Sequence, residues 1–398
     1  MAEIPLYPLY NTSYQLYRVS PLHHGDSPLL NDRTLRTHAR RLRDLLKGDN
    51  VRGVDVDFAG TEGALPKLGP LEECNWDLVG DEDAWIDRHR QSVDPDASQL
   101  SSVLSPDRAR GIGVELGYEK TAYNALLLRD PGTTPSPEGF TSLPLLMVKM
   151  PAAIREVFLN YLKTAFDAHV APLRLPSTFL ASTLETYFRH LGESTSTQKI
   201  QHVIQQLKVQ LTFPQSTSLL KHIEVTIASH DVPGFISRGK LLATTNQKPF
   251  TAALSRYIQK HLAFDLSNPK VYISRIQCGA FVLQTDRLKL MLPEGLSDVS
   301  FDEDSSAVES SAAQLAVQEI YSSLIREATG TGKFLPESIV EELRSSTPSS
   351  VGSGRRGRRK RAVSTTASSS AATKRPRGRP KTVNGGLSAQ EDEEMADA

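Results

Sequence analysis

The chain has 398 residues with 46 basic and 46 acidic side chains, so its formal net charge is zero. This length can bury a large core in one large domain or two medium ones, without stabilising disulfides. Cys74 and Cys278 stand outside any zinc-ligand or redox spacing, which predicts ordinary buried thiols in a reducing compartment. Residues 1–17 contain no signal-peptide pattern, and no stretch reaches the ~18 apolar residues of a membrane span, so we expect a soluble, intracellular protein.

The N-terminal region begins with a strand predicted at residues 14–19, where side chains alternate between two faces. After a turn at residues 21–28, Asn31 or Asp32 can cap a helix that ends at Gly48. One face of this helix is apolar, and the other is basic: Arg33, Arg36, Arg40, Arg41, Arg43 and Lys47. A solvated helix face is the simpler interpretation of that stripe, and contact with phosphates or an acidic partner is the alternative.

Strands separated by loops are predicted for the rest of this region. Their ranges are 51–58, 71–79, 111–118, 122–128 and 143–150. We expect the second of these strands to pair with the first. The segment from residue 80 to 110 is polar, acidic and rich in turn formers, which predicts a long surface insertion. Residues 131–139, rich in Pro and Thr, predict a loop.

Helices and clustered strands are predicted for the second half of the chain. The helices cover residues 151–165, 177–191, 250–262 and 307–327, and the strands cover 208–213, 222–229, 270–275, 279–284 and 288–292. Because the strands do not alternate regularly with helices, we predict an α+β fold with a mainly antiparallel sheet covered by helices. We divide it into α+β regions at 1–150 and 151–330, which can form one continuous body.

The C-terminal segment 344–398 differs in composition from the rest. Beyond Leu343 it has no aromatic residue and is rich in Ser, Arg, Ala, Thr, Gly and Pro. Such a segment cannot bury enough apolar surface to offset its ordering entropy, so we predict a disordered tail. From Thr347 onward, its basic residues lie between Arg355 and Lys381 and its acidic ones between Glu391 and Asp397, a block pattern typical of solvated interaction tails.

The tail contains an element similar to an AT-hook, made of Lys374, Arg375, Pro376, Arg377, Gly378, Arg379, Pro380 and Lys381. Gly378 lets the backbone lie flat on the floor of a narrow minor groove, and the prolines keep the chain extended. A·T tracts narrow this groove and deepen its negative potential, which attracts Arg377 and Arg379. The flanking cations add salt-sensitive phosphate contacts. We therefore predict weak binding to A·T-rich DNA that acts through avidity.

Nuclear import is the second role that we predict for the tail, and import alone is the alternative to DNA contact. A first basic cluster precedes residues 374–381 and is made of Arg355, Arg356, Arg358, Arg359, Lys360 and Arg361. Two such clusters form a bipartite arrangement. Both interpretations place the protein in the nucleus.

Patterns that would indicate catalysis or metal binding are incomplete. The Gly330–Lys333 segment is similar to part of a phosphate loop, but it lacks the earlier glycine and the hydroxyl residue that such a loop requires. His23, His24 and Asp26 lie in a proline-flanked turn, with no second cluster at ligand spacing. No nucleophile elbow organises the serines, histidines and carboxylates. We predict a protein without enzymatic activity, metal or cofactor.

A family resemblance adds to this interpretation. The run from Leu9 to Gly25, LYNTSYQLYRVSPLHHG, resembles the opening of the fungal inner-kinetochore family related to centromere protein L. Supporting similarity lies in residues 35–49, 63–76 and 274–293. The resemblance implies a curved antiparallel sheet in a non-catalytic scaffold of the constitutive centromere-associated network, at the centromere in the nucleus.

The resemblance also implies partners. These are a CENP-N-like subunit, which pairs through a C-terminal sheet edge, and other inner-kinetochore proteins. On this chain the edge would be Lys270 to Leu292, for which an ordinary internal sheet is the alternative. The AT-hook-like tail is not implied by the family. A chromatin or transcription cofactor that uses this hook is therefore the alternative function.

Overall fold

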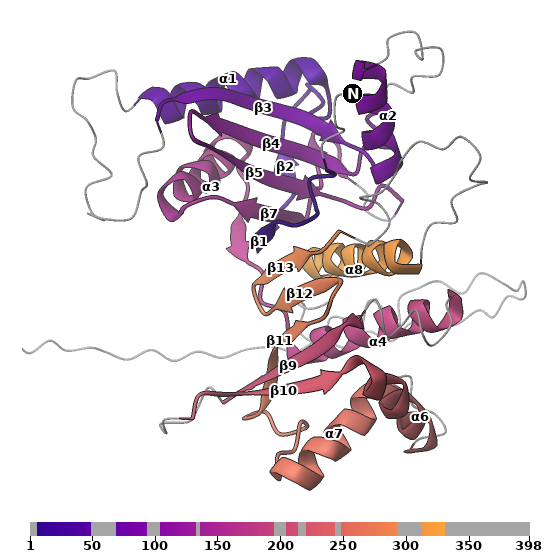
Figure 1. The fold of residues 1–398 in the computed structure, drawn as a ribbon. Coiled ribbons are helices and arrows are strands. Elements are labelled where there is room, and N and C mark those ends of the chain that lie inside the picture. Colours follow the sequence, from indigo (N-terminus) through magenta and orange to yellow (C-terminus); the bar gives the residue numbers. More distant parts are fainter. Residues whose placement is uncertain are drawn as a thin grey trace, which may run out of the picture. The chain divides into compact units, whose positions relative to one another are not determined.

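A large antiparallel sheet forms the framework of the fold (Figure 1). The computed structural model describes residues 6–48, 69–93, 104–132, 136–194, 204–213, 220–242, 248–292 and 312–330. The strand order is β10-β9-β11-β12-β13-β1-β7-β5-β4-β3, and β8 also pairs with β1. In chain order the strands are β1 (Ser13–Val19), β3 (Leu71–Val79), β4 (Gly111–Tyr118), β5 (Thr121–Leu128), β7 (Leu145–Lys149), β8 (Val170–Pro172), β9 (Gln206–Thr212), β10 (His222–Ala228), β11 (Tyr272–Gln277), β12 (Phe281–Gln284) and β13 (Arg287–Leu290).

Helices accompany the sheet but do not alternate regularly with its strands. Within the described ranges they are α1 (Asp32–Gly48), α2 (Glu82–Val93), α3 (Ala152–Phe166), α4 (Ser177–Ser194), α6 (Val232–Leu242), α7 (Pro249–Leu262) and α8 (Ala312–Thr329). Two short strands, β2 (Leu22–His23) and β6 (Phe140–Thr141), pair with each other outside the large sheet. Every ladder between named strands is antiparallel, so the predicted α+β class is confirmed.

The central strands β5 and β7 are buried on both faces. Their register places Leu126 opposite Met147 and Leu127 opposite Leu146. Because successive side chains of a strand point to opposite faces, Leu126 and Met147 enter one hydrophobic cluster while Leu127 and Leu146 enter the other. This two-sided burial explains why residues 143–148 form a continuous apolar run instead of an alternating one.

Helices α1 and α3 belong to the cluster on one of these faces. Asn31 caps α1, because its side-chain oxygen accepts a hydrogen bond from the Arg33 N–H at 2.9 Å. The helix buries Leu35 and Leu42, and the basic stripe predicted along it is exposed. For α3, Pro151 occupies the N-cap, one residue before the position that the sequence suggested.

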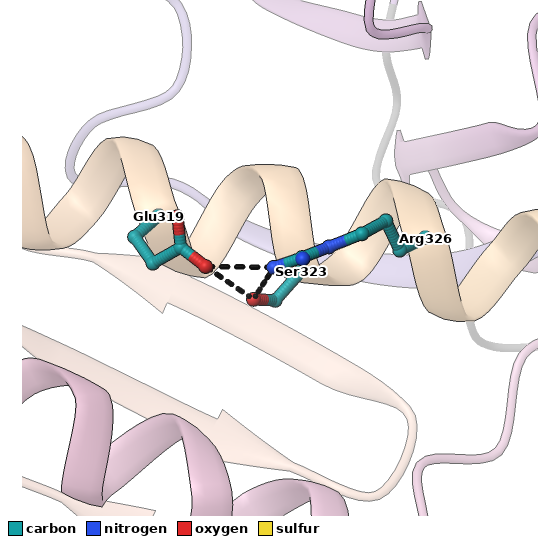
Figure 2. Close-up of polar contacts among 3 residues, drawn as sticks. All are labelled: Glu319, Ser323 and Arg326. Atoms are coloured by element: carbon teal, nitrogen blue, oxygen red, sulfur yellow. Dashed lines mark hydrogen bonds and ion pairs between the residues drawn. The ribbon is translucent and has the colours of Figure 1, made fainter. Parts of the chain in front are cut away.

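Helices α4 and α8 belong to the cluster on the other face and contact each other. Figure 2 shows a polar group on α8, in which the Arg326 guanidinium lies 2.7 Å from a Glu319 carboxylate oxygen and 3.0 Å from the Ser323 hydroxyl. These side chains are spaced at three to seven residues along one helix, so the group stabilises α8 locally. Gly330 then ends the helix with a left-handed backbone (φ +63°).

Two helices differ from the sequence-based expectation. Residues 80–110 do not form only an irregular insertion, because α2 begins within them and Trp85 packs against the core. The Asp81 side chain accepts a hydrogen bond from the Ala84 N–H and caps this helix. Helix α6 was not predicted either. It begins at Val232, and the two residues that follow, Pro233 and Gly234, normally indicate a turn. The strand predicted at 51–58, and its pairing with β3, lie outside the described residues.

Candidate partner-docking edge

The segment predicted to offer a sheet edge, Lys270 to Leu292, is internal. Its first strand, β11, pairs with β9 on one side and β12 on the other. Its last strand, β13, pairs with β12 and β1. The prediction of an exposed edge here is therefore wrong, and the alternative of an ordinary internal sheet is confirmed. The reason is topological: the hairpin of β9 and β10 comes earlier in the chain but adds outside β11.

Strand β10 is instead the terminal strand on this side of the sheet. It pairs with β9 along its whole length, from His222 opposite Thr212 to Ala228 opposite Gln206. Within the described ranges no strand pairs with its other side. A terminal strand presents a row of backbone N–H and C=O groups on its outer side, which another extended chain can bind. The opposite terminal strand is β3, and the residues 49–68 that precede it lie outside the described ranges.

The sequence of β10, HIEVTIA, offers little protection against strand pairing. Proteins commonly protect an edge with proline, lysine or a bulge, and β10 has none of these. Its one carboxylate, Glu224, is paired with the Lys208 ammonium of β9 at 3.2 Å. Ile223 and Val225 are half-buried, so one face of the strand already rests on the core. The strand is thus formed and neutral at its edge, which suits it to accept a partner strand.

Exposed apolar side chains are concentrated in the segment that contains β10, α6 and α7. The described part of the chain has eight large hydrophobic side chains that are exposed, and five fall between residues 220 and 262: Leu220, Leu241, Leu242, Tyr257 and Leu262. Leu241 at the end of α6 is 87% exposed. Figure 1 shows α6 and α7 beside β10 at this end of the sheet. Single exposed apolar residues are common, but their concentration near a terminal strand is typical of an interaction site.

A buried carboxylate ties α7 to the rest of the body. Glu185 on α4 is 5% exposed and accepts a hydrogen bond from the Thr251 N–H in the first turn of α7. Burial raises the pKa of this carboxyl, and the hydrogen bond from Thr251 together with the charge of Lys248 opposes that rise. A carboxylate at a helix N-terminus also interacts favourably with the helix dipole. The surface beside β10 therefore rests on an anchored helix.

Cys74, Cys278 and His23 are residue types that can react or bind a metal. Cys74 and Cys278 are buried as predicted, and burial raises the pKa of the two thiols to about 12 and about 11. Such thiols are poor nucleophiles at neutral pH. His23 packs against Phe140, and no group of three potential metal ligands is found among the described residues. None of the described helices is both long and apolar enough to cross a membrane.

The residues predicted to bind DNA and to direct nuclear import lie in the tail, at 374–381 and 355–361. Both segments fall outside the described residues. The strand predicted at 222–229 is confirmed as β10, but its terminal position in the sheet and the exposed apolar side chains near it were not predicted. The sequence signal that could have indicated a free edge was the strand HIEVTIA itself, which is rich in β-branched residues, has no lysine or proline and carries one negative charge.

A model of a known protein family matches most of the chain. The family model of centromere protein L (CENP-L) matches residues 8–329, which include every described strand and helix of the body. A search of curated proteins found no match.

Proposed function

The chain belongs to the centromere protein L family, and we propose that it works as a non-catalytic scaffold subunit of the inner kinetochore. Members of this family are structural proteins of the kinetochore and localise to the nucleus at centromeres. In the proposed role, the body binds a CENP-N-like subunit and other inner-kinetochore proteins, while the tail holds the assembly near A·T-rich DNA.

The unpaired outer side of β10 carries the first part of this proposal. A strand from the partner adds to β10 and extends the sheet, with affinity from main-chain hydrogen bonds. Exposed side chains of α6 and α7, including Leu241 and Tyr257, supply the apolar contact beside it. Backbone pairing alone is weakly selective, so this side-chain contact distinguishes the partner from other extended chains.

A pair of neighbouring proline substitutions tests the edge. In an antiparallel ladder, hydrogen-bonding groups of successive residues point to opposite sides of the strand. Of Glu224→Pro and Val225→Pro, one therefore removes an N–H bonded to β9, and the other removes an N–H on the free side. The variant that keeps the wild-type melting temperature should lose at least about tenfold in affinity for the CENP-N-like subunit, because a strand-pairing bond and its geometry are lost.

Surface substitutions provide a test that does not depend on how proline affects the fold. Leu241→Ser and Tyr257→Ala alter exposed side chains and should weaken the complex. Leu45→Ser is the matched control, because Leu45 is 47% exposed on α1, away from β10. Wild-type affinity in the stable proline variant and in Leu241→Ser would exclude the edge as the docking site.

The tail carries the second part of the proposal. Arg377 and Arg379 flank a single glycine in a segment that also supplies proline and further cations. This pattern favours insertion into a narrow minor groove over recognition of a base sequence. One such element binds weakly, so it acts by raising the residence time of a complex that other contacts already hold near DNA.

A further inference from the structure

A second surface feature lies on α1, in the N-terminal half of the body and apart from β10. A cavity of about 720 Å³ opens between the first turns of α1, the segment 23–28 and the end of α3. Helix α1 lines it with Thr34, Thr37, His38 and Arg41, positions that share one face of a helix. Its volume is in the range of sites that hold a small ligand or a side chain with its flanking backbone.

The lining of this cavity is cationic and contains no aspartate or glutamate. Arg33 and Arg41 both line it and are exposed, and neither guanidinium pairs with a carboxylate among the described residues. Asp32 and Asp26 are close in sequence, but they are not part of the lining. Two unpaired guanidinium groups at one concave site attract an anion, because Arg forms forked hydrogen bonds to phosphate and carboxylate oxygens.

His38 gives the cavity a fixed polar group. His38 is buried, with 8% of its surface accessible, whereas the two arginines are exposed. The ring lies 4.5 Å from the Phe166 ring and stacks on Trp76 at 5.9 Å, measured between centroids. Its Nδ1 atom is 2.8 Å from the Tyr161 hydroxyl, and Nε2 makes no hydrogen bond with a described residue. The imidazole is thus held in place by neighbours with one nitrogen still available.

The protonation of His38 is consistent with a role as a neutral donor. Burial and the charge of Arg41 lower its pKa to about 4, so the ring is neutral at pH 7. The Tyr161 hydroxyl has one proton, and it lies 2.8 Å from Nδ1 and 3.3 Å from the His38 carbonyl oxygen, which is an alternative acceptor. In the tautomer in which the hydroxyl donates to Nδ1, at the shorter distance, the ring proton resides on Nε2. That N–H, the Thr34 hydroxyl and the two guanidinium groups together supply more donors than a carboxylate oxygen pair can accept. A phosphate monoester, with three terminal oxygens and nearly two negative charges, matches them better.

We propose that this cavity binds a phosphorylated side chain of a partner polypeptide, with Arg33 and Arg41 as the anion ligands and His38 as a hydrogen-bond donor. A polypeptide fits better than duplex DNA, because the site is concave and bounded by a loop, whereas a duplex needs an extended surface to contact successive phosphates. The neighbouring Phe140 side chain, 38% exposed and 5.0 Å from His23 between ring centroids, offers an apolar contact for a residue beside the phosphate. This inference does not depend on β10.

Two double substitutions on α1 test the proposal in the full chain. Arg33→Ala with Arg41→Ala removes the cavity pair, and Arg36→Ala with Arg40→Ala removes the same charge from exposed positions outside the lining. The probe is a fluorescent pool of peptides with one fixed phosphothreonine between random residues, and the same pool without phosphate is the reference. Because all four arginines are exposed, we expect each variant to keep the wild-type melting temperature.

The cavity variant should bind the phosphopeptide pool at least about tenfold more weakly than wild type, and the outside variant within about twofold. Binding of the unphosphorylated pool should be weak and equal in all three proteins. Equal losses in the two variants would show general attraction to a basic surface and overturn the proposal. Inorganic phosphate that binds as tightly as the pool, or a short duplex DNA that binds more tightly and depends on the cavity pair, would also overturn it.

Discussion

The Glu224 carboxylate of β10 lies 3.2 Å from the Lys208 ammonium of β9. This pair neutralises the one carboxylate of the terminal strand while leaving the outer backbone groups uncovered. Both side chains are partly exposed, so the pair contributes little to stability by itself, within about 1 kcal/mol. The ion pair matters for binding, because a partner strand that covers β10 must also cover the Glu224 carboxylate.

Replacing Lys208 should therefore affect the complex more than the fold. Lys208→Ala leaves the Glu224 charge without its partner, and covering that charge has an additional desolvation cost. We expect a loss of several-fold in affinity for the CENP-N-like subunit, measured by calorimetric titration, with little change in melting temperature. Adding Glu224→Gln should restore most of the affinity. An unchanged affinity in Lys208→Ala would mean that the partner does not approach this side of the sheet.

The stability of the body should depend on pH through His38. Its pKa is lowered from 6.5 to about 4 by burial and by Arg41, so the unfolded chain binds this proton before the folded one. The free energy of unfolding should therefore decrease as the pH falls from 6.5 towards 4, with no further loss from this group below that range. His38→Gln cannot take up the proton. Denaturant unfolding across this range should show a smaller pH dependence in the variant, and identical slopes would contradict the assignment.

The packing of α6 against α7 should depend on the absence of a side chain at Gly239. A Cβ atom there would overlap the carbonyl group of Pro249 at the start of α7. Gly239→Ala must therefore separate the two helices, and we expect a loss of roughly 2–3 kcal/mol in unfolding free energy. Gly234→Ala in the same helix is the control, because its Cβ would meet only the Arg238 side chain at ordinary contact distance. That variant should be neutral or slightly stabilised.

Binding of the tail to DNA should depend on the two arginines around Gly378. Arg377→Ala with Arg379→Ala should abolish the preference for A·T over G·C duplex while leaving the melting temperature unchanged. The matched control, Arg358→Ala with Arg359→Ala, removes the same charge from the first basic cluster and should weaken binding to both duplexes equally. Competition binding at fixed salt distinguishes these results. Equal loss of preference in both variants would remove the minor-groove explanation.

The elements that the sequence predicted well are those whose pattern is local. In α1 and α3 the apolar residues follow the helical period, and in β5 and β7 both faces are apolar because both are buried. Helix α6 escaped detection because Pro233 and Gly234 stand in its first turn, where backbone geometry tolerates them. The order of the strands in the sheet cannot be predicted from a local sequence pattern. That β10 and not β11 ends the sheet depends on pairing between strands about sixty residues apart in the chain.

The candidate sites were predictable to different degrees. The basic stripe of α1 was evident from sequence, but its division into a cavity side and an open side was not. That division depends on the segment 23–28 and on Phe166 at the end of α3, which close the cavity only in the folded chain. The free edge of β10 could not be predicted for a similar reason. Whether a strand is terminal depends on which other strands pair with it in the folded chain.

Hydrogen exchange of the complex between this chain and a CENP-N-like subunit tests the central claim most directly. Residues 222–228 should exchange more slowly in the complex than in the free protein, because a partner strand then occupies the outer side of β10. Strand β3, at the other end of the sheet, should be unchanged. A stable complex in which β10 exchanges as fast as in the free chain would contradict the account.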